Sequence, residues 1–238
     1  MLLFYIRHGD PIYNPDSLTP LGTRQAEAVG RRLAMHGLDK IYASTSERAI
    51  LTAKPAAEIT KREIVMLDFC NERYAWDEFV TFNEKGEKDW VWRYPKTAAI
   101  LLSPEITALG DKWYEHPSLK DTKCREGMER VNRESDAFLL SLGYKHIREK
   151  RLYEPVAPTN DRIALFAHQG FSQAFLSSIL DIPYPLFATH FDMTPSAFTA
   201  IEFKERDKKV IPRVLTLSND SHIYRDALPT KYQNTLYF

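Results

Sequence analysis

Cysteine is scarce in this sequence, where only Cys70 and Cys124 occur among 238 residues. Two thiols in a chain of this length do not make a disulfide framework, and they lack the spacing of a metal-binding motif. We interpret them as buried or partly buried thiols in a reducing compartment. The chain is long enough to build a hydrophobic core without disulfides or metals.

A surplus of charge is also absent, because 32 basic residues balance 32 acidic ones. General nucleic-acid binders are basic overall, so this class is disfavoured, although a local basic pocket stays open. Long apolar runs are missing too, since Arg7-His8-Gly9 interrupts the apolar start at residues 1–6. Neither a secretory signal nor a membrane span is predicted. We expect a cytoplasmic protein with no nucleic-acid or membrane partner, and the oligomeric state stays open.

What the sequence does contain is an alternation of short apolar runs with helical segments. Hydrophobic residues make up 44% and charged residues 27%, as in ordinary globular proteins. Strands are predicted at residues 2–6, 40–44 and 64–69, and helices at about 19–35 and 47–58. This order predicts an α/β fold, a three-layer sandwich with a mostly parallel central sheet flanked by helices.

The pattern changes between residues 73 and 161, where all four tryptophans lie. Helices are expected there around residues 104–115 and 125–142. We interpret 73–161 as a mainly helical cap inserted within one domain of residues 1–238. A loop is expected at residues 9–18, a strand at 162–167 and a helix at 171–180. Two further strands, at 196–203 and 210–217, are expected to form a hairpin.

Three predicted strand ends present arginine or histidine side chains. Arg7 and His8 follow the first strand, and His168 follows a later one. Arg48 lies in the first turn of a helix, where free backbone N–H groups favour anions. Each residue alone has a simpler structural interpretation. Because ligands bind at the carboxyl ends of parallel strands, the four residues together predict a phosphate site.

These residues fall within motifs that resemble the histidine phosphatase superfamily, also called phosphoglycerate mutase-like. Arg7-His8-Gly9 is similar to the defining triplet of that family, and Asn14 lies where many members have a phosphate-contacting asparagine. The remaining matches follow in the family's order across almost the whole chain: Leu-Thr-x-x-Gly-x-x-Gln-Ala at 18–26, Ser-x-x-x-Arg-Ala-x-x-Thr-Ala at 44–53, Asn71-Glu72-Arg73, His168 and Asn219-Asp220-Ser221-His222.

The resemblance implies phosphoryl transfer through a phosphohistidine on His8. A neutral His8 would attack phosphorus in line, which divides hydrolysis into two easier steps. Arg7, Arg48 and His168 would hold the phosphoryl oxygens, with His168 expected as an imidazolium. No metal or other cofactor is implied, because these cations take the place of a metal.

The leaving oxygen needs a proton, and the resemblance implies Glu72 as its donor, in the family branch with a glutamate acid. Asp10 is the alternative donor. Asn14, Gln169, Gly9 and Asp10 are also expected to contact the substrate. Gln169 replaces the aspartate of the acid phosphatase branch, which argues against that branch.

The resemblance therefore implies a metal-independent phosphomonoesterase for a small phosphorylated metabolite. Alternatives are a cofactor-dependent phosphoglycerate mutase, disfavoured by the short loop after Asn14, a phosphoprotein phosphatase, and a phospholigand-binding protein on the same fold. The cap has no motif that identifies the substrate, and its tryptophans either pack its interior or line a pocket.

Overall fold

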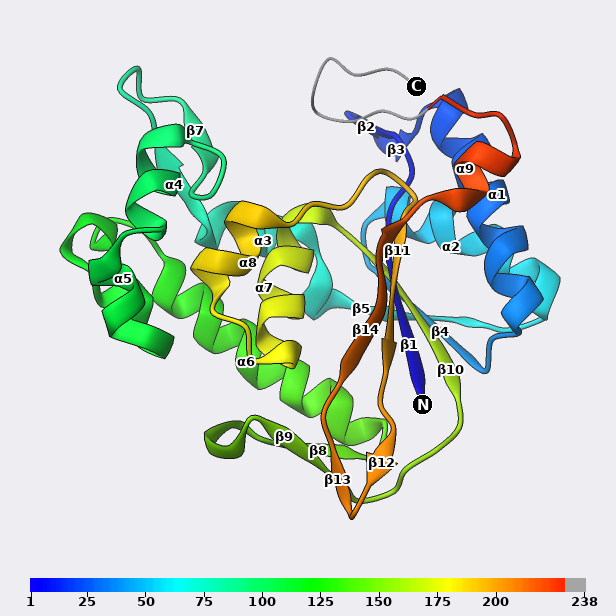
Figure 1. Cartoon of the computed structure of the whole chain (residues 1–238). Helices are drawn as coiled ribbons and strands as arrows, with labels where there is room; N and C mark the ends of the chain where they lie inside the picture. Colours follow the sequence, from blue (N-terminus) through cyan, green and yellow to red (C-terminus); the bar gives the residue numbers. More distant parts are fainter. Residues whose placement is uncertain (230–238) are drawn as a thin grey trace.

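The computed structural model describes residues 1–229 (Figure 1). Its largest sheet has six strands in the order β14-β11-β1-β10-β4-β5. Four neighbouring strands are parallel, and two at one side run antiparallel to their neighbours. The mixed α/β fold with a mostly parallel sheet is confirmed. The strands are β1 (Leu2–Arg7), β4 (Lys40–Ser44), β5 (Ile64–Leu67), β10 (Arg162–Ala167), β11 (Phe198–Glu202) and β14 (Arg213–Asn219).

Helices cover both faces of this sheet (Figure 1). One face is covered by α1 (Pro20–His36), α2 (Glu47–Thr60) and α9 (Ser221–Arg225). The other face is covered by α3 (Glu72–Glu78), α6 (Cys124–Ser141), α7 (Gln169–Leu180) and α8 (Tyr184–His190).

The start of α1 shows how local sequence sets an element. Thr19 caps the helix by accepting a hydrogen bond from the Gly22 amide, and Pro20 occupies the first helical position. Gly37, with a positive φ of 72°, ends it. The predicted helix at 19–35 is therefore confirmed to within a residue at each end.

The loop expected at residues 9–18 instead contains a short hairpin. Strands β2 (Pro11–Tyr13) and β3 (Asp16–Leu18) pair in antiparallel register, with Tyr13 opposite Asp16. Strands of three residues are too short for an alternating pattern to reveal them. The strand expected at 64–69 is also shorter, because a 3-10 turn at Asp68–Cys70 follows Leu67.

Residues 73–161 hold several helices, a two-stranded antiparallel sheet, and two strands of a second antiparallel sheet that two strands near the end of the chain complete. Helix α6 belongs to the main core, since Val131 and Leu139 share one hydrophobic cluster with Tyr5 of β1 and Phe171 of α7. The segment therefore helps to cover the central sheet as well as the region beyond it. Its other elements are β6 (Val80–Phe82), β7 (Lys88–Trp90), α4 (Pro95–Leu101), α5 (Pro104–Leu109), 3-10 turns at Gly110–Glu115 and Pro117–Leu119, β8 (Tyr144–Ile147) and β9 (Leu152–Pro155).

The hairpin expected near the end of the chain is present as β11 and β14. Its tip forms β12 (Glu205–Arg206) and β13 (Lys209–Val210), and β13 pairs with β9. Residues 230–238, included in the single domain expected from the sequence, lie outside the described residues. Over residues 1–229, no helix is both long and apolar enough to cross a membrane.

Candidate active site

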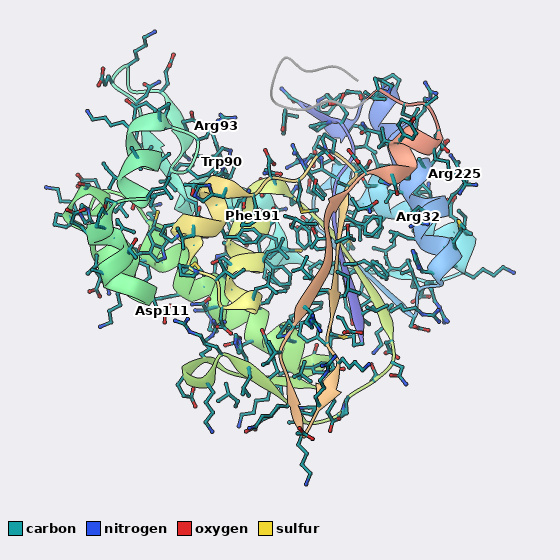
Figure 2. The ribbon with its side chains drawn as sticks, in the orientation of Figure 1. Arg32, Trp90, Arg93, Asp111, Phe191 and Arg225 are labelled. Carbon is teal, nitrogen blue, oxygen red and sulfur yellow. The ribbon has the colours of Figure 1, made fainter. Side chains whose placement is uncertain are left out.

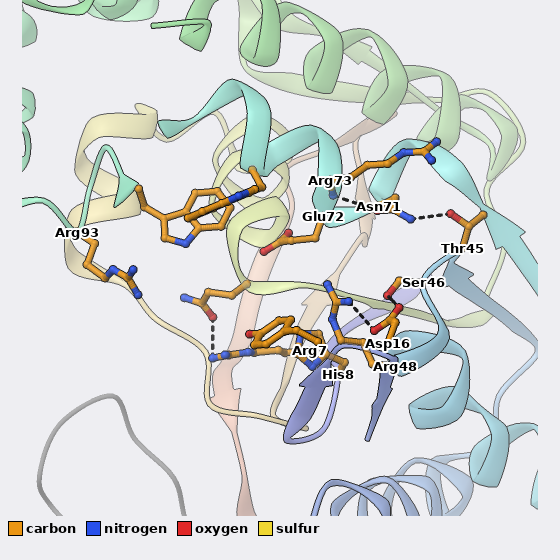
Figure 3. Close-up of a pocket in the computed structure, with 14 residues that line it drawn as sticks. Arg7, His8, Asp16, Thr45, Ser46, Arg48, Asn71, Glu72, Arg73 and Arg93 are labelled. Carbon is orange, nitrogen blue, oxygen red and sulfur yellow. Dashed lines mark hydrogen bonds and ion pairs between the residues drawn. The ribbon is translucent and has the colours of Figure 1, made fainter. Parts of the chain in front are cut away.

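The carboxyl ends of β1, β4 and β10 meet at a pocket of about 670 Å³ (Figure 3). Parallel strands direct these ends to one edge of the sheet, where α/β proteins bind ligands. Arginine and aromatic side chains dominate the lining: Arg7, His8, Tyr13, Asp16, Thr45, Ser46, Arg48, Asn71, Glu72, Arg73, Trp76, Trp90, Arg93 and Gln169.

His8 is buried, with 3% of its surface exposed. Its Nδ1 lies 2.7 Å from the Gly9 carbonyl oxygen, so Nδ1–H donates and Nε2 keeps its lone pair. Burial, followed by the charges of Arg7 and Arg48, lowers the pKa of His8 to about 3. At neutral pH the imidazole is therefore uncharged, as a nucleophile must be.

Gly9 is not among the residues that line the pocket, and its backbone instead holds His8 and α2. Its amide donates to Thr52 Oγ1 at 3.0 Å. A Cβ on Gly9 would meet the Gly22 carbonyl oxygen at 2.6 Å, so no larger residue fits. The close approach of β1 to α1 therefore accounts for both glycines of the motifs.

Arg7 is buried beside His8 and held by groups that follow β10 and α8. Its Nη1 donates to Gln169 Oε1 at 3.1 Å and to the Met193 carbonyl. Gln169 in turn donates to Asp192. Gln169 therefore lines the pocket and also orients Arg7. The Arg7 Nε is buried and has no partner among the described residues.

Arg48 lies in the first turn of α2, as expected, with 11% of its side chain exposed. Its Nη1 donates to Asp16 Oδ1 at 2.7 Å, a pairing that the sequence did not reveal. The ring of Tyr13 lies 5.4 Å from Arg48 Cζ. Within residues 1–229, the buried Arg48 Nε has no hydrogen-bond partner.

His168 is fully buried, and its ring centre lies 5.2 Å from that of His8. Its Nε2 lies 2.8 Å from Ser44 Oγ, which also accepts from the Ser46 amide. Its Nδ1 is buried without a partner in the described part of the chain. Burial, then the charges of His8, Arg48 and Arg7, lowers the pKa of His168 well below its usual value, so without a bound anion the ring is neutral.

Glu72 begins α3 and lies across the pocket from Arg7 and His8 (Figure 3). Its Oε1 accepts from the Gly170 amide at 2.7 Å and its Oε2 from the Phe171 amide at 2.9 Å, at the start of α7. Burial raises the pKa of the carboxyl, although both hydrogen bonds oppose this. Glu72 is therefore a pocket-lining carboxyl whose pKa is raised by its burial.

Asp10 and Asn14, both expected to contact the substrate, are not among the residues that line the pocket. Asp10 is buried at the start of α1, where its Oδ2 accepts from Thr19 Oγ1 at 2.8 Å. Asn14 lies exposed at the turn between β2 and β3, because the short segment folds back as a hairpin. Asp16, two residues further on, enters the pocket instead.

The outer wall of the pocket contains residues that no motif had indicated. Trp76 and Trp90 line it with ring centres 4.8 Å apart, and Arg93 follows β7. Figure 2 shows Trp90 and Arg93 on the side of the helical region that faces the central sheet. Gly170 allows Trp90 to pack closely, since a Cβ there would lie 2.2 Å from the indole. By contrast, Trp113 packs inside, stacked on a tyrosine ring.

The described residues, 1–229, include no cluster of three or more histidine, cysteine, aspartate or glutamate side chains suited to a metal ion. Both cysteines are buried thiols.

Three comparisons place the chain among known proteins. Residues 3–99 match the model of the histidine phosphatase superfamily, branch 1. No curated protein sequence matches the chain.

Solved structures match it over nearly their whole length. A phosphoserine phosphatase from Entamoeba histolytica, in complex with 3-phosphoglyceric acid, is 17% identical with a TM-score of 0.59, covering 93% of this chain and 98% of that one. A mycobacterial glucosyl-3-phosphoglycerate phosphatase is 17% identical with a TM-score of 0.57, covering 91% and 98%. A protein described as mycobacterial hydrolase 1 is 16% identical with a TM-score of 0.59, covering 92% and 98%. At these identities the likeness shows a shared fold. Together with the family model over residues 3–99, it confirms the resemblance of the motifs to the histidine phosphatase superfamily.

Proposed function

We propose that this chain is a metal-independent phosphomonoesterase that hydrolyses a small phosphorylated metabolite through a phosphohistidine on His8. One observation supports this most strongly. Arg7 Nε, Arg48 Nε and His168 Nδ1, on three residues around His8, are buried without partners among residues 1–229. Buried polar atoms are costly when unpaired. A phosphoryl group supplies acceptors for the two arginine N–H groups and for His168, whose Nδ1 would donate once it carries a proton.

In the first step, His8 Nε2 attacks phosphorus and the bond to the ester oxygen breaks. The leaving oxygen takes the proton of the Glu72 carboxyl, whose raised pKa favours the protonated form. In the second step, water attacks the phosphohistidine while the Glu72 carboxylate takes one of its protons. Inorganic phosphate then leaves, and both residues return to their starting states.

Arg73 bears on the alternative mutase function, which requires additional cations to retain a bisphosphate. Its Nη2 lies 2.9 Å from Asp68 Oδ2 and also donates to the Tyr74 hydroxyl. Because Arg73 is occupied at the edge of the pocket, phosphatase activity is favoured over mutase activity. The two phosphatases named among the similar structures act, by their names, on small phosphorylated compounds, which supports the same substrate class.

The region 73–161 is proposed to select the substrate. Trp76, Trp90 and Arg93 come from it and form the outer wall of the pocket. The inner wall, around His8 and Arg48, would hold the phosphoryl group of any substrate.

The test is phosphate release from a panel of sugar, glycerate, nucleotide and aryl phosphates with EDTA present. We expect metal-independent turnover of at least one compound by the wild type and none by His8→Ala. His36→Ala, an exposed histidine at the far end of α1, is the matched control and should equal the wild type. Turnover by His8→Ala would reject the nucleophile, and no turnover by the wild type would favour a phospholigand-binding protein.

A further inference from the structure

A carboxylate already pairs with one of the arginines that the proposed phosphatase would use to hold its phosphoryl group. The carboxylate belongs to Asp16, at the tip of the β2–β3 hairpin, and it lines the same pocket as His8 and Arg48. Figure 3 shows the Asp16 carboxylate directed at the Arg48 guanidinium. From this arrangement we infer that Asp16 positions Arg48 and competes with the phosphoryl group for it, which keeps inorganic phosphate weakly bound.

Every contact of this carboxylate resembles that of a bound anion. Its Oδ1 accepts from Arg48 Nη1 at 2.7 Å, and its Oδ2 accepts from Ser46 Oγ at 2.7 Å and from the Glu47 amide at 2.9 Å. These donors lie at the start of α2, a helix of 14 residues whose amino end favours negative charge. Although partial burial opposes ionisation, the bonds from Ser46 and Arg48 lower the pKa of Asp16, so it is ionised at neutral pH.

The hairpin holds Arg48 from two sides. Tyr13, paired across the hairpin with Asp16, places its ring 5.4 Å from Arg48 Cζ. A guanidinium fixed by an ion pair and an aromatic ring loses little freedom when it binds a ligand. The buried Arg48 Nε, which has no partner among the described residues, is the donor left for the phosphoryl group.

The charges around His8 explain how Asp16 weakens the binding of phosphate. Asp16 offsets the charge of Arg48. With His8 and His168 neutral and Glu72 protonated, Arg7 then supplies the remaining positive charge beside His8, which is less than a phosphate dianion prefers. Asp16 therefore lowers affinity for substrate and product alike, which speeds release of phosphate after hydrolysis.

The inference rests on the proposed function, since it assumes that Arg48 holds the phosphoryl group. Two variants separate its parts. Asp16→Asn keeps the shape and an oxygen that can accept from Arg48 but removes the charge, whereas Asp16→Ala removes both. Asp111→Asn is the matched control, because Asp111 is an exposed partner of Arg151 and does not line this pocket.

The measurements are calorimetric binding of inorganic phosphate to the full chain and the kcat and KM of the best panel substrate. We expect Asp16→Asn to bind phosphate about tenfold more tightly and to lower KM to a similar extent, with kcat equal or reduced. Asp16→Ala should lower kcat at least tenfold, because Arg48 is no longer held. The control should differ from the wild type by less than twofold in each quantity.

Equal or weaker phosphate binding by Asp16→Asn, in a protein that melts at the wild-type temperature, would overturn the competition. So would the absence of phosphate binding in every variant. Tighter phosphate binding by Asp16→Asn in a protein that hydrolyses no panel compound would support the competition and reject the proposed function, so the two failures are distinguishable.

Discussion

At the scale of single residues, the burial of His8 links the reactive state of its imidazole to the stability of the fold. The lowered pKa, about 3, keeps His8 neutral in the folded protein, whereas the unfolded chain protonates it near the ordinary value. Between those two pH values the unfolded state binds more protons, so acid favours unfolding. Burial of His8 therefore lowers the stability of the fold in acid and keeps the imidazole in the neutral form that the proposed nucleophilic attack requires.

This linkage predicts a pH-dependent gain in stability for His8→Gln. Relative to the wild type, the free energy of unfolding of His8→Gln should rise as pH falls below about 6.5, by up to about 1.4 kcal/mol per pH unit, since the variant has no group to protonate there. Denaturant unfolding at several values between pH 7 and pH 4 measures it. His190→Gln, at an exposed histidine, is the control and should follow the wild type. Parallel curves for wild type and His8→Gln would contradict the burial argument.

Glu72 leads to a prediction that separates it from Asp10. Glu72→Gln should lower kcat/KM by about 100-fold or more for alkyl phosphates, whose leaving oxygens need a proton, and much less for aryl phosphates. Asp10→Asn should reduce both to a similar extent, because Asp10 supports the start of α1 outside the pocket. Leaving-group series for the two variants provide the measurement, and the opposite pattern would transfer the donor role to Asp10.

At the scale of elements, a buried ion pair joins the start of the 73–161 region to the main core. Arg130 of α6 donates from Nε and Nη2 to the two carboxylate oxygens of Glu78 in α3, each at 2.6 Å, and from Nη1 to the Phe69 carbonyl at 2.9 Å. The pair has 15% and 12% of its side chains exposed. Since α3 begins with Glu72, the same contact holds Glu72, the proposed proton donor, over the pocket.

Arg130→Met should therefore destabilise the fold by about 3 kcal/mol, because it leaves the Glu78 carboxylate buried without its cation. Glu78→Met added to Arg130→Met should recover part of this loss, as two apolar side chains replace the pair. Arg133→Met is the control on the same helix, exposed and expected to change stability by less than about 0.5 kcal/mol. Denaturant melts compare the three, and a loss in Arg130→Met no larger than the control's would refute the role of the pair.

Local sequence signals account for the elements that were predicted well. The apolar run of β1, the strand β4 and the Thr19-Pro20 start of α1 depend on neighbours in the chain. The β2–β3 hairpin was missed because strands of three residues are too short to show an alternating pattern. Contacts with α2, such as the Asp16–Arg48 pair, hold the hairpin in place, and the sequence does not reveal them. Helix α8, which has seven residues, was likewise not predicted.

The residues of the site likewise divide into those that sequence motifs predicted and those that only tertiary packing brings to the pocket. Arg7, His8, Arg48 and Glu72 stand within ordered motifs and were placed correctly in the pocket. Asp16 reaches it from the short β2–β3 hairpin and Arg93 from the turn after β7. The paths of both segments depend on tertiary packing, so no spacing in the sequence could reveal these residues. The charge state of His168 also depends on groups that only the fold brings together.

At the scale of the whole molecule, the pocket draws on distant parts of the chain. The family model matches residues 3–99, which include Arg7, His8, Arg48 and Glu72. His168 and Gln169 come from beyond that match, and β10 brings them beside β1 through the parallel pairing of Arg7 with Ala167. The central claim, phosphoryl transfer onto His8, thus depends on the fold as a whole.

The measurement that tests this claim most directly is trapping of the intermediate. A radiolabelled substrate from the panel is mixed with the full chain and EDTA, and the reaction is quenched in alkaline denaturant within a single turnover. The account predicts a protein label that is stable in alkali, is released by acid and maps to the peptide containing His8. The label should be absent from His8→Ala and present in His36→Ala. Turnover with no label on His8, or an equal label in His8→Ala, would contradict the account.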